Sequence, residues 1–218
     1  MPESSATASR LAGDLLRIGA VKLSPEAPFT WASGLRSPVY CDNRLTIGHP
    51  EVRRRITDGF VEIIRAVGLQ PEVIAGTATA GIPHAAWLAD RLGLPMVYVR
   101  SKAKGHGTSS RIEGPVDPGR RVLLVEDLVS TGGSSVTALE ALREAGFEVR
   151  DVLAIYTYGF TRAEEAFAAA EARLHVLTSL ESLIDEARAQ HYLDGAAIES
   201  LEAWRSDPEG WSAGSHQL

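Results

Sequence analysis

The sequence predicts one α/β domain in which helices cover both faces of a parallel sheet. Short apolar segments have the length and composition of buried strands, at 72–75, 95–99, 121–125 and 149–155. Helical patterns at 81–92 and 134–145 separate neighbouring strands. Such alternation is typical of parallel sheets, which bind ligands at the carboxyl ends of their strands. With 218 residues, the chain is long enough for one such domain and short for two.

The elements before this repeat follow from periodicity and from stop signals. Apolar residues at helical spacing predict a first helix over 9–18, which Gly19 ends. Alternating apolar and polar residues on either side of a turn predict a hairpin over 29–41. Pro50 is a favourable first-turn residue, and it begins a long amphipathic helix that Gly68 ends.

The elements after the fourth strand are shorter. A helix is expected at 163–172 and a final strand near 174–177. Two further helical segments follow, at 180–190 and 194–204. The parallel sheet should therefore end near residue 178, and the rest of the chain should be an addition to it.

The bulk properties exclude several classes of protein. A hydrophobic content of 44% and a charged content of 23% are those of a globular protein. The net charge of −6 argues against nucleic acid as a partner, and the apolar runs are far shorter than the ~20 residues of a membrane span. The single Cys41 cannot form an internal disulfide. Because residues 1–10 lack the apolar stretch of a secretory signal, we expect a cytoplasmic protein.

One stretch, 122–134, joins a buried strand, two acidic residues and a Gly/Ser-rich turn into a helix. Main-chain N–H groups at such a turn bind anions. The carboxylates of Glu126 and Asp127 would repel a bare anion, so the ligand must also donate hydrogen bonds, as ribose hydroxyls do. We therefore expect a ribose 5-phosphate with its phosphate on 130–134. The alternative is a Gly-rich turn beside two solvated acids; a Walker A loop is excluded because no Lys follows the glycines.

The segment 100–111 holds four basic residues and a histidine within twelve positions. Its small, polar residues predict a long mobile loop, which could close over a diphosphate and exclude water. A solvated linker is the alternative for this loop taken alone. A nucleic-acid patch is disfavoured, because no aromatic residues are interleaved with the basic ones.

The 122–134 stretch resembles the diphosphate-sugar-binding motif of the type I phosphoribosyltransferases. Further segments are similar to orotate phosphoribosyltransferases: 29–44 to their hood, 75–83 (AGTATAGIP) to their pyrophosphate loop, 100–114 to their catalytic loop, and 204–211 to their ending. The resemblance implies a type I phosphoribosyltransferase-like parallel sheet flanked by helices, all in one domain, 1–218. Its core would be about 50–178, with a small hood from about 10–48 and part of the C-terminal region.

The resemblance also implies roles by position. The residues of the diphosphate sugar site would be Arg100, Lys104, His106, Glu126, Asp127, Leu128, Val129, Ser130, Thr131, Gly132, Gly133 and Ser134. Of these, Lys104 and Asp127 are the catalytic candidates. Ser130 matches a position that touches orotate, and the orotate carboxylate could be bound by Arg44 or by main-chain amides near Tyr40. We expect His49 and His84 to be surface or hydrogen-bonded histidines without metal-ligand partners.

The implied reaction transfers a 5-phosphoribosyl group from 5-phosphoribosyl 1-diphosphate to orotate. Its products would be orotidine 5'-phosphate, an intermediate of UMP biosynthesis, and pyrophosphate. The implied cofactor is Mg²⁺, bound mainly by diphosphate and ribose oxygens rather than by a protein cage. The resemblance also implies a homodimer whose active sites are shared, because the basic loop of one subunit reaches the site of the other.

The sequence departs from the enteric branch of that family at three lysine positions and one arginine position. Ala32, Ala80 and Ser101 stand where that branch has lysines, and Tyr156–Thr157 where it has an arginine. Lys102, Arg36 and Arg44 could compensate in charge. Two other functions stay open: a phosphoribosyltransferase for another base, such as a purine, and a regulatory module that binds the diphosphate sugar without turning it over.

Overall fold

The computed structural model describes residues 5–31, 33–101 and 111–214, and it confirms the α/β fold. Within these residues the central sheet has six strands in the order β10-β9-β8-β5-β6-β7, and all neighbours are parallel except β6 and β7. The strands are β5 (Val73–Thr77), β6 (Met96–Val99), β7 (Ile112–Glu113), β8 (Arg121–Val129), β9 (Glu148–Thr157) and β10 (Arg173–Ser179).

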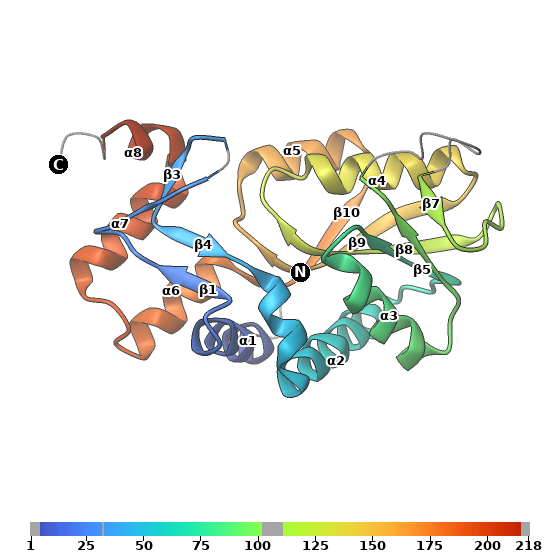
Figure 1. Ribbon diagram of the computed structural model, residues 1–218, viewed down its shortest axis with the longest axis horizontal. Helices are drawn as coiled ribbons and strands as arrows, with labels where there is room; N and C mark the ends of the chain where they lie inside the picture. The colour runs from blue at the N-terminus through green and yellow to red at the C-terminus, as the bar shows by residue number, and fades with distance from the viewer. Residues whose placement is uncertain (1–4, 32, 102–110, 215–218) are drawn as a thin grey trace.

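Helices cover both faces of this sheet (Figure 1). One face carries α1 (Ser5–Arg17), α2 (Pro50–Val67) and α3 (Gly81–Leu92), and the other carries α4 (Gly133–Glu144) and α5 (Thr161–Ala169). Side chains alternate between the faces along each strand. In β8, Leu123 and Val125 therefore join the core under α1 to α3, whereas Val122 and Leu124 join the core under α4 and α5.

The predicted limits of some helices agree closely with the structure, whereas α1 begins at Ser5 rather than at residue 9 and α5 ends at Ala169 rather than at residue 172. Helix α3 spans the expected residues, and α2 begins at Pro50 as expected. Gly68 ends α2 in the left-handed region, with φ of 74°, which glycine adopts without steric cost. No helix in the described part of the chain is long and apolar enough to cross a membrane.

The hood lies beside this core, at the left of Figure 1. It holds β1 (Val21–Leu23), β2 (Phe29–Thr30), β3 (Arg36–Ser37), β4 (Val39–Cys41), the 3₁₀ helix η1 (Asn43–Gly48), α6 (Leu180–Ala189), α7 (Gly195–Ser206) and α8 (Pro208–Gly214). The predicted hairpin over 29–41 is shorter than expected. Only β2 and β3 form it, whereas β4 pairs with β1.

Aromatic rings join the hood to the core. Trp204 of α7 is fully buried, and its ring meets Trp31, Tyr158 and Phe160 at centroid distances of 5.5–5.8 Å. Its indole N–H donates to the main-chain oxygen of Arg36 in β3 (3.2 Å). Trp31 itself is partly buried and packs against the core. This cluster connects β3, α7 and the end of β9, so the hood and the sheet support each other.

Removing the Trp204 ring should destabilise the protein strongly. We expect Trp204→Ala to lower the free energy of unfolding by about 3–5 kcal/mol, because it leaves a cavity and removes the hydrogen bond from the indole to the Arg36 carbonyl. Urea unfolding followed by circular dichroism measures this. The control is Tyr192→Ala, at a ring that is 54% exposed, where a change within about 0.5 kcal/mol is expected. Equal effects of the two substitutions would contradict the role of the aromatic cluster.

Candidate active site

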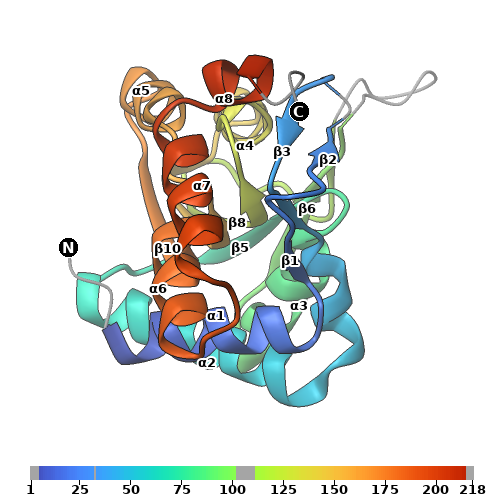
Figure 2. The same ribbon diagram turned by 90° about the vertical axis from the view of Figure 1, so that its left-hand side faces the viewer.

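The candidate site lies at the carboxyl end of β8, where several segments meet (Figures 1 and 2). Glu126 and Asp127 are inside this strand, which continues to Val129 by pairing with β9. The prediction that the strand ends at residue 125 was therefore wrong. The pairing of β8 with β5 ends at Val125. The main chain of the acidic pair therefore lies past the last residue of β8 that pairs with β5, but it is still part of the pairing with β9.

The carboxyl group of Glu126 is removed from water, with only 5% of the residue exposed. The Ser135 hydroxyl donates to its Oε2 (3.3 Å), and the main-chain N–H of Asp127 donates to its Oε1 (3.1 Å). Burial and the neighbouring Asp127 carboxyl raise the pKa of Glu126 to about 8. Burial also raises the pKa of Asp127. The pair therefore favours a ligand that donates hydrogen bonds or brings positive charge.

The predicted phosphate loop, 130–134, follows directly. The Thr157 hydroxyl and the Tyr158 N–H both donate to the Val129 carbonyl (3.1 and 3.2 Å), which fixes the start of the loop. Gly132 adopts φ of 79° at the N-cap of α4, and an added Cβ would lie 3.3 Å from the Phe167 ring. Gly132, the N-cap residue, has no side chain that could cap this helix. Its first N–H groups are therefore placed as an anion site requires.

The segment 75–83 approaches β8 from the neighbouring strand. A Cβ on Gly81 would lie 2.5 Å from the Val125 carbonyl oxygen, so only glycine permits this contact. The peptide bond between Ala78 and Thr79 is cis. Ala78 donates its N–H to the Val99 carbonyl (2.8 Å), next to Arg100. The expected pyrophosphate loop, the acidic pair and the start of the basic segment are therefore neighbours.

The basic segment is described only at its two ends. Arg100 donates its N–H to the Arg111 carbonyl (2.8 Å), and the Arg111 Nε donates to the Arg100 carbonyl (3.2 Å). The Arg100 guanidinium also pairs with Glu113 (3.4 Å). Of the residues expected at the diphosphate, Lys104 and His106 lie outside the described residues, as does Lys102.

The hood contributes Tyr40 and Arg44, the candidates near orotate. Arg44 binds Asp42 through two hydrogen bonds, Nε to Oδ1 (2.6 Å) and Nη2 to Oδ2 (2.8 Å). These bonds to Asp42 raise the pKa of Arg44. The nearby Tyr40 and Asp127 raise the pKa of Arg44 further. Tyr40 is 40% exposed and contacts the Phe29 ring at 5.5 Å. To bind an orotate carboxylate, Arg44 would have to share its guanidinium with Asp42.

Sequence reasoning missed residues that support the acidic pair. Ser135 bonds to Glu126, as described above, and the buried Asn43 donates its Nδ2 to the Asp127 carbonyl (2.7 Å). Asn43 lies inside the hood motif, but no local pattern indicates its partner 84 positions away. His84 is buried with one ring nitrogen near the Thr46 hydroxyl, and His49 is exposed.

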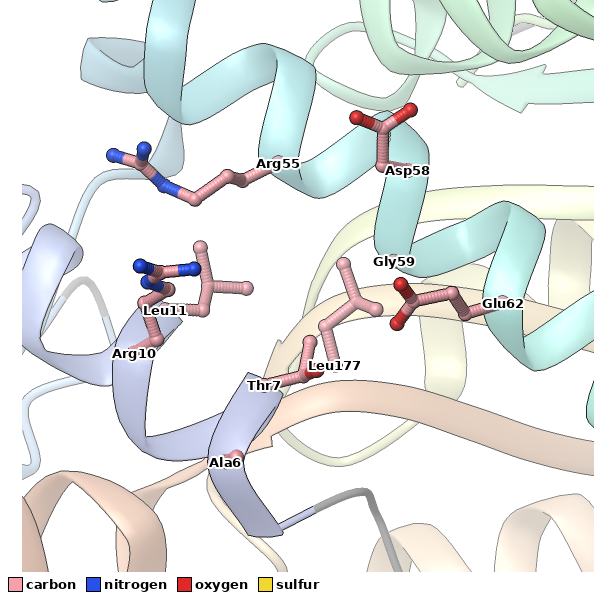
Figure 3. A pocket seen from close by; sticks show the side chains of 9 residues that line it. All are labelled: Ala6, Thr7, Arg10, Leu11, Arg55, Asp58, Gly59, Glu62 and Leu177. Carbon is pink, nitrogen blue, oxygen red and sulfur yellow. The ribbon is translucent and has the colours of Figure 1, made fainter.

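A cavity of about 410 Å³ lies elsewhere, between α1, α2 and β10 (Figure 3). Arg10 and Arg55 line it together with Asp58 and Glu62. The Arg55 Nε donates to the Asp14 carboxylate (2.5 Å). This cavity contains none of the residues that the sequence predicted for the site. The predicted site residues therefore lie outside this cavity.

The buried carboxyl of Glu126 should make stability depend on pH. Its pKa is about 8 in the folded protein and near 4.5 when exposed, so protonation favours folding. The free energy of unfolding of the ligand-free protein should therefore fall as pH rises from about 4.5 to about 8. The loss is up to about 1.4 kcal/mol per pH unit. Glu126→Gln, which cannot ionise, should gain stability over the wild type as pH rises. Urea unfolding at about pH 5, 7 and 9 measures the difference; a difference independent of pH would contradict the assignment.

Comparison with known proteins matches this geometry to a family. The family model of the phosphoribosyl transferase domain matches residues 46–170. An orotate phosphoribosyltransferase of Listeria monocytogenes is 51% identical over 202 residues, 93% of this chain and 97% of the relative. One of Bacillus caldolyticus is 52% identical over 203 residues, 93% of this chain and 98% of the relative.

Solved structures of orotate phosphoribosyltransferases are also similar to this chain. Orotate phosphoribosyltransferase from Aeropyrum pernix superposes with a TM-score of 0.73 at 34% identity, over 84% of this chain and 99% of that one. The structure of Mycobacterium tuberculosis orotate phosphoribosyltransferase in complex with 5-phospho-α-D-ribosyl 1-diphosphate superposes with a TM-score of 0.62 at 26% identity. The match covers 82% of this chain and 92% of that one. Because half of the residues are identical over nearly the whole length of the relatives, this chain belongs to the orotate phosphoribosyltransferase family, with the type I phosphoribosyltransferase fold.

Proposed function

We propose that this protein transfers the 5-phosphoribosyl group of 5-phosphoribosyl 1-diphosphate to orotate, with orotidine 5'-phosphate and pyrophosphate as products in pyrimidine biosynthesis. The observation that carries the proposal is the acidic pair of β8, set directly before an uncapped helix N-terminus. In this arrangement the N–H groups of 131–134 bind the 5-phosphate. Glu126 and Asp127 accept hydrogen bonds from the ribose hydroxyls, which compensates for their burial.

The reaction displaces pyrophosphate at the anomeric carbon of the ribose. Positive charge develops on the sugar as its bond to the diphosphate lengthens, and Asp127 beneath the ribose favours that charge. Arg100, Lys104 and His106 stabilise the negative charge on the departing diphosphate. Orotate is a nitrogen nucleophile that ionises readily, so the reaction requires no strong protein base. Ser130, Tyr40 and Arg44 are the proposed neighbours of orotate, with Arg44 shared between Asp42 and the substrate carboxylate.

We include Mg²⁺ as the cofactor of this reaction. The fit rests on the acidic pair: burial raises the pKa of both carboxyl groups, and a cation together with the ribose hydroxyls would stabilise their charged forms. Glu126 and Asp127 would bind the ion through the substrate, whose diphosphate and ribose oxygens supply most of its ligands. When bound, Mg²⁺ offsets the charge of the leaving diphosphate. Among the described residues, His, Cys, Asp and Glu form no cluster of three that could hold a metal.

We also propose that the enzyme is a homodimer, in which the basic segment of one subunit completes the site of the other. The support is the family resemblance of 100–114 together with the position of its base, beside Ala78 at the edge of the site. The highly charged diphosphate sugar does not cross lipid bilayers, so a cytoplasmic location is part of the same proposal.

Pyrophosphate release should depend on orotate. We expect release from the diphosphate sugar with Mg²⁺ and orotate, together with loss of the orotate ultraviolet absorbance, and none with adenine, hypoxanthine or uracil. Turnover with a purine base but not with orotate would contradict the proposal. Tight binding of the diphosphate sugar without any pyrophosphate release would instead indicate a regulatory module.

Sharing of the site can be tested with mixed dimers. Lys104→Ala should lower kcat by about 10²–10³-fold, because it removes a cation from the leaving group, and Asp127→Ala should also lower kcat strongly. In a dimer of one Lys104→Ala subunit and one Asp127→Ala subunit, donation across the interface leaves one complete site. We expect tagged mixed dimers to recover activity that neither parent has. No recovery would contradict donation between subunits.

A further inference from the structure

A chain of buried polar side chains connects three elements around the site. His84 of α3 places its Nε2 3.3 Å from the Thr46 hydroxyl of η1, and Thr46 donates to the Asn43 carbonyl (2.6 Å). Asn43 in turn donates its Nδ2 to the Asp127 carbonyl of β8 (2.7 Å). Exposure of His84, Thr46 and Asn43 is 1%, 0% and 1%. A polar chain this deeply buried is costly if any link is lost.

The direction of each hydrogen bond follows from the donors available. The Thr46 hydroxyl has one hydrogen, which it gives to the Asn43 carbonyl, so it must accept from the Nε2–H of His84. Burial lowers the pKa of His84 to about 4, so the ring is neutral near pH 7. Its Nδ1 is then the unprotonated nitrogen, and it has no hydrogen-bond partner among the described residues. His84 therefore acts as a single, fixed donor.

The other end of the chain holds the main chain of an acidic residue. The last residue pair between β5 and β8 is Gly76 with Val125, so the main chain of Asp127 has no partner residue in β5. Asn43 reaches this carbonyl from the hood, and its Oδ1 accepts from the Cys41 thiol (3.4 Å). His84 sits in the first turn of α3, directly after the segment 75–83. This series of hydrogen bonds thus connects the proposed ribose-binding segment with the expected diphosphate-binding segment.

We propose that Asn43, Thr46 and His84 are positioning residues, which hold the Asp127 main chain in a fixed place relative to the segment 75–83. This inference rests on the proposed function, because it assumes that both segments bind one molecule of the diphosphate sugar. The three side chains touch no substrate in this arrangement. They set the distance between the groups that bind the ribose and the groups that bind the diphosphate. Displacements of about 1 Å in such groups cost up to ~10²-fold in rate.

Thr46→Val tests the central link, because valine has the shape of threonine without its hydroxyl. We expect kcat/KM for the diphosphate sugar to fall about 10–100-fold, with the orotate KM changed less than about twofold. Thr46→Ser keeps the hydroxyl and should restore most of the loss. The matched control is Thr57→Val, since Thr57 is also a buried residue and its hydroxyl donates to a main-chain carbonyl, that of Arg53 (3.0 Å), within α2.

A second pair of variants tests the histidine end and guards against misfolding of Thr46→Val. His84→Gln keeps an N–H donor near the place of Nε2, whereas His84→Leu removes it. We expect His84→Leu to weaken binding of the diphosphate sugar in calorimetry by about tenfold relative to His84→Gln. The kinetic constants are measured at a temperature well below the thermal unfolding midpoint of each variant. Loss of folded protein then does not contribute to the differences in these constants.

The outcomes separate the two proposals. If Thr46→Val and His84→Leu lose stability, as Thr57→Val does, but keep wild-type kinetic constants and affinity, the positioning role is wrong and the chain only supports the fold. If the wild type and Thr57→Val release no pyrophosphate with orotate, the proposed function is wrong. Calorimetry with the diphosphate sugar still decides the positioning role in that case.

Discussion

Two adjacent carboxyl groups at the end of β8, those of the buried Glu126 and the partly buried Asp127, are the constraint on which the site depends. Burial disfavours the charged forms of both groups and raises the pKa values of Glu126 and Asp127. At Glu126, repulsion by the neighbouring Asp127 carboxyl raises the pKa further. A fold retains such a pair at a cost to its stability unless a ligand compensates. Ribose hydroxyls and a divalent cation both would do so. The acids therefore favour the diphosphate sugar as a whole over a bare phosphate.

The surrounding structure keeps this pair in place from several sides. The strand β9 continues the ladder past the end of β5, and Ser135 of α4 supports the Glu126 carboxyl. Gly81 allows the start of α3 to touch the main chain of β8. The hood adds the Asn43 bond to Asp127, and the aromatic cluster around Trp204 anchors the hood. Packing far from the chemistry thus determines the geometry of the acids.

The order of strands and helices, the long helix from Pro50 and the Gly/Ser-rich turn into α4 could all be predicted, because each depends on local patterns. The end of β8 could not. Two acidic residues after four apolar ones indicate the end of a strand, whereas pairing with β9 carries this strand on to Val129. The pairing of β1 with β4 and the chain from His84 to Asn43 join residues distant in sequence, which periodicity does not reveal. The bond between Arg44 and Asp42 is local, but the sequence alone left Arg44 equally able to bind substrate.

The most direct test is a crystal structure of the protein with 5-phosphoribosyl 1-diphosphate and Mg²⁺. The account predicts ribose hydroxyls within about 2.6–3.2 Å of the Glu126 and Asp127 carboxyl oxygens. It places the 5-phosphate on the main-chain N–H groups of 131–134. A bound sugar whose hydroxyls face away from both carboxyl groups, or whose 5-phosphate occupies another part of the protein, would contradict it.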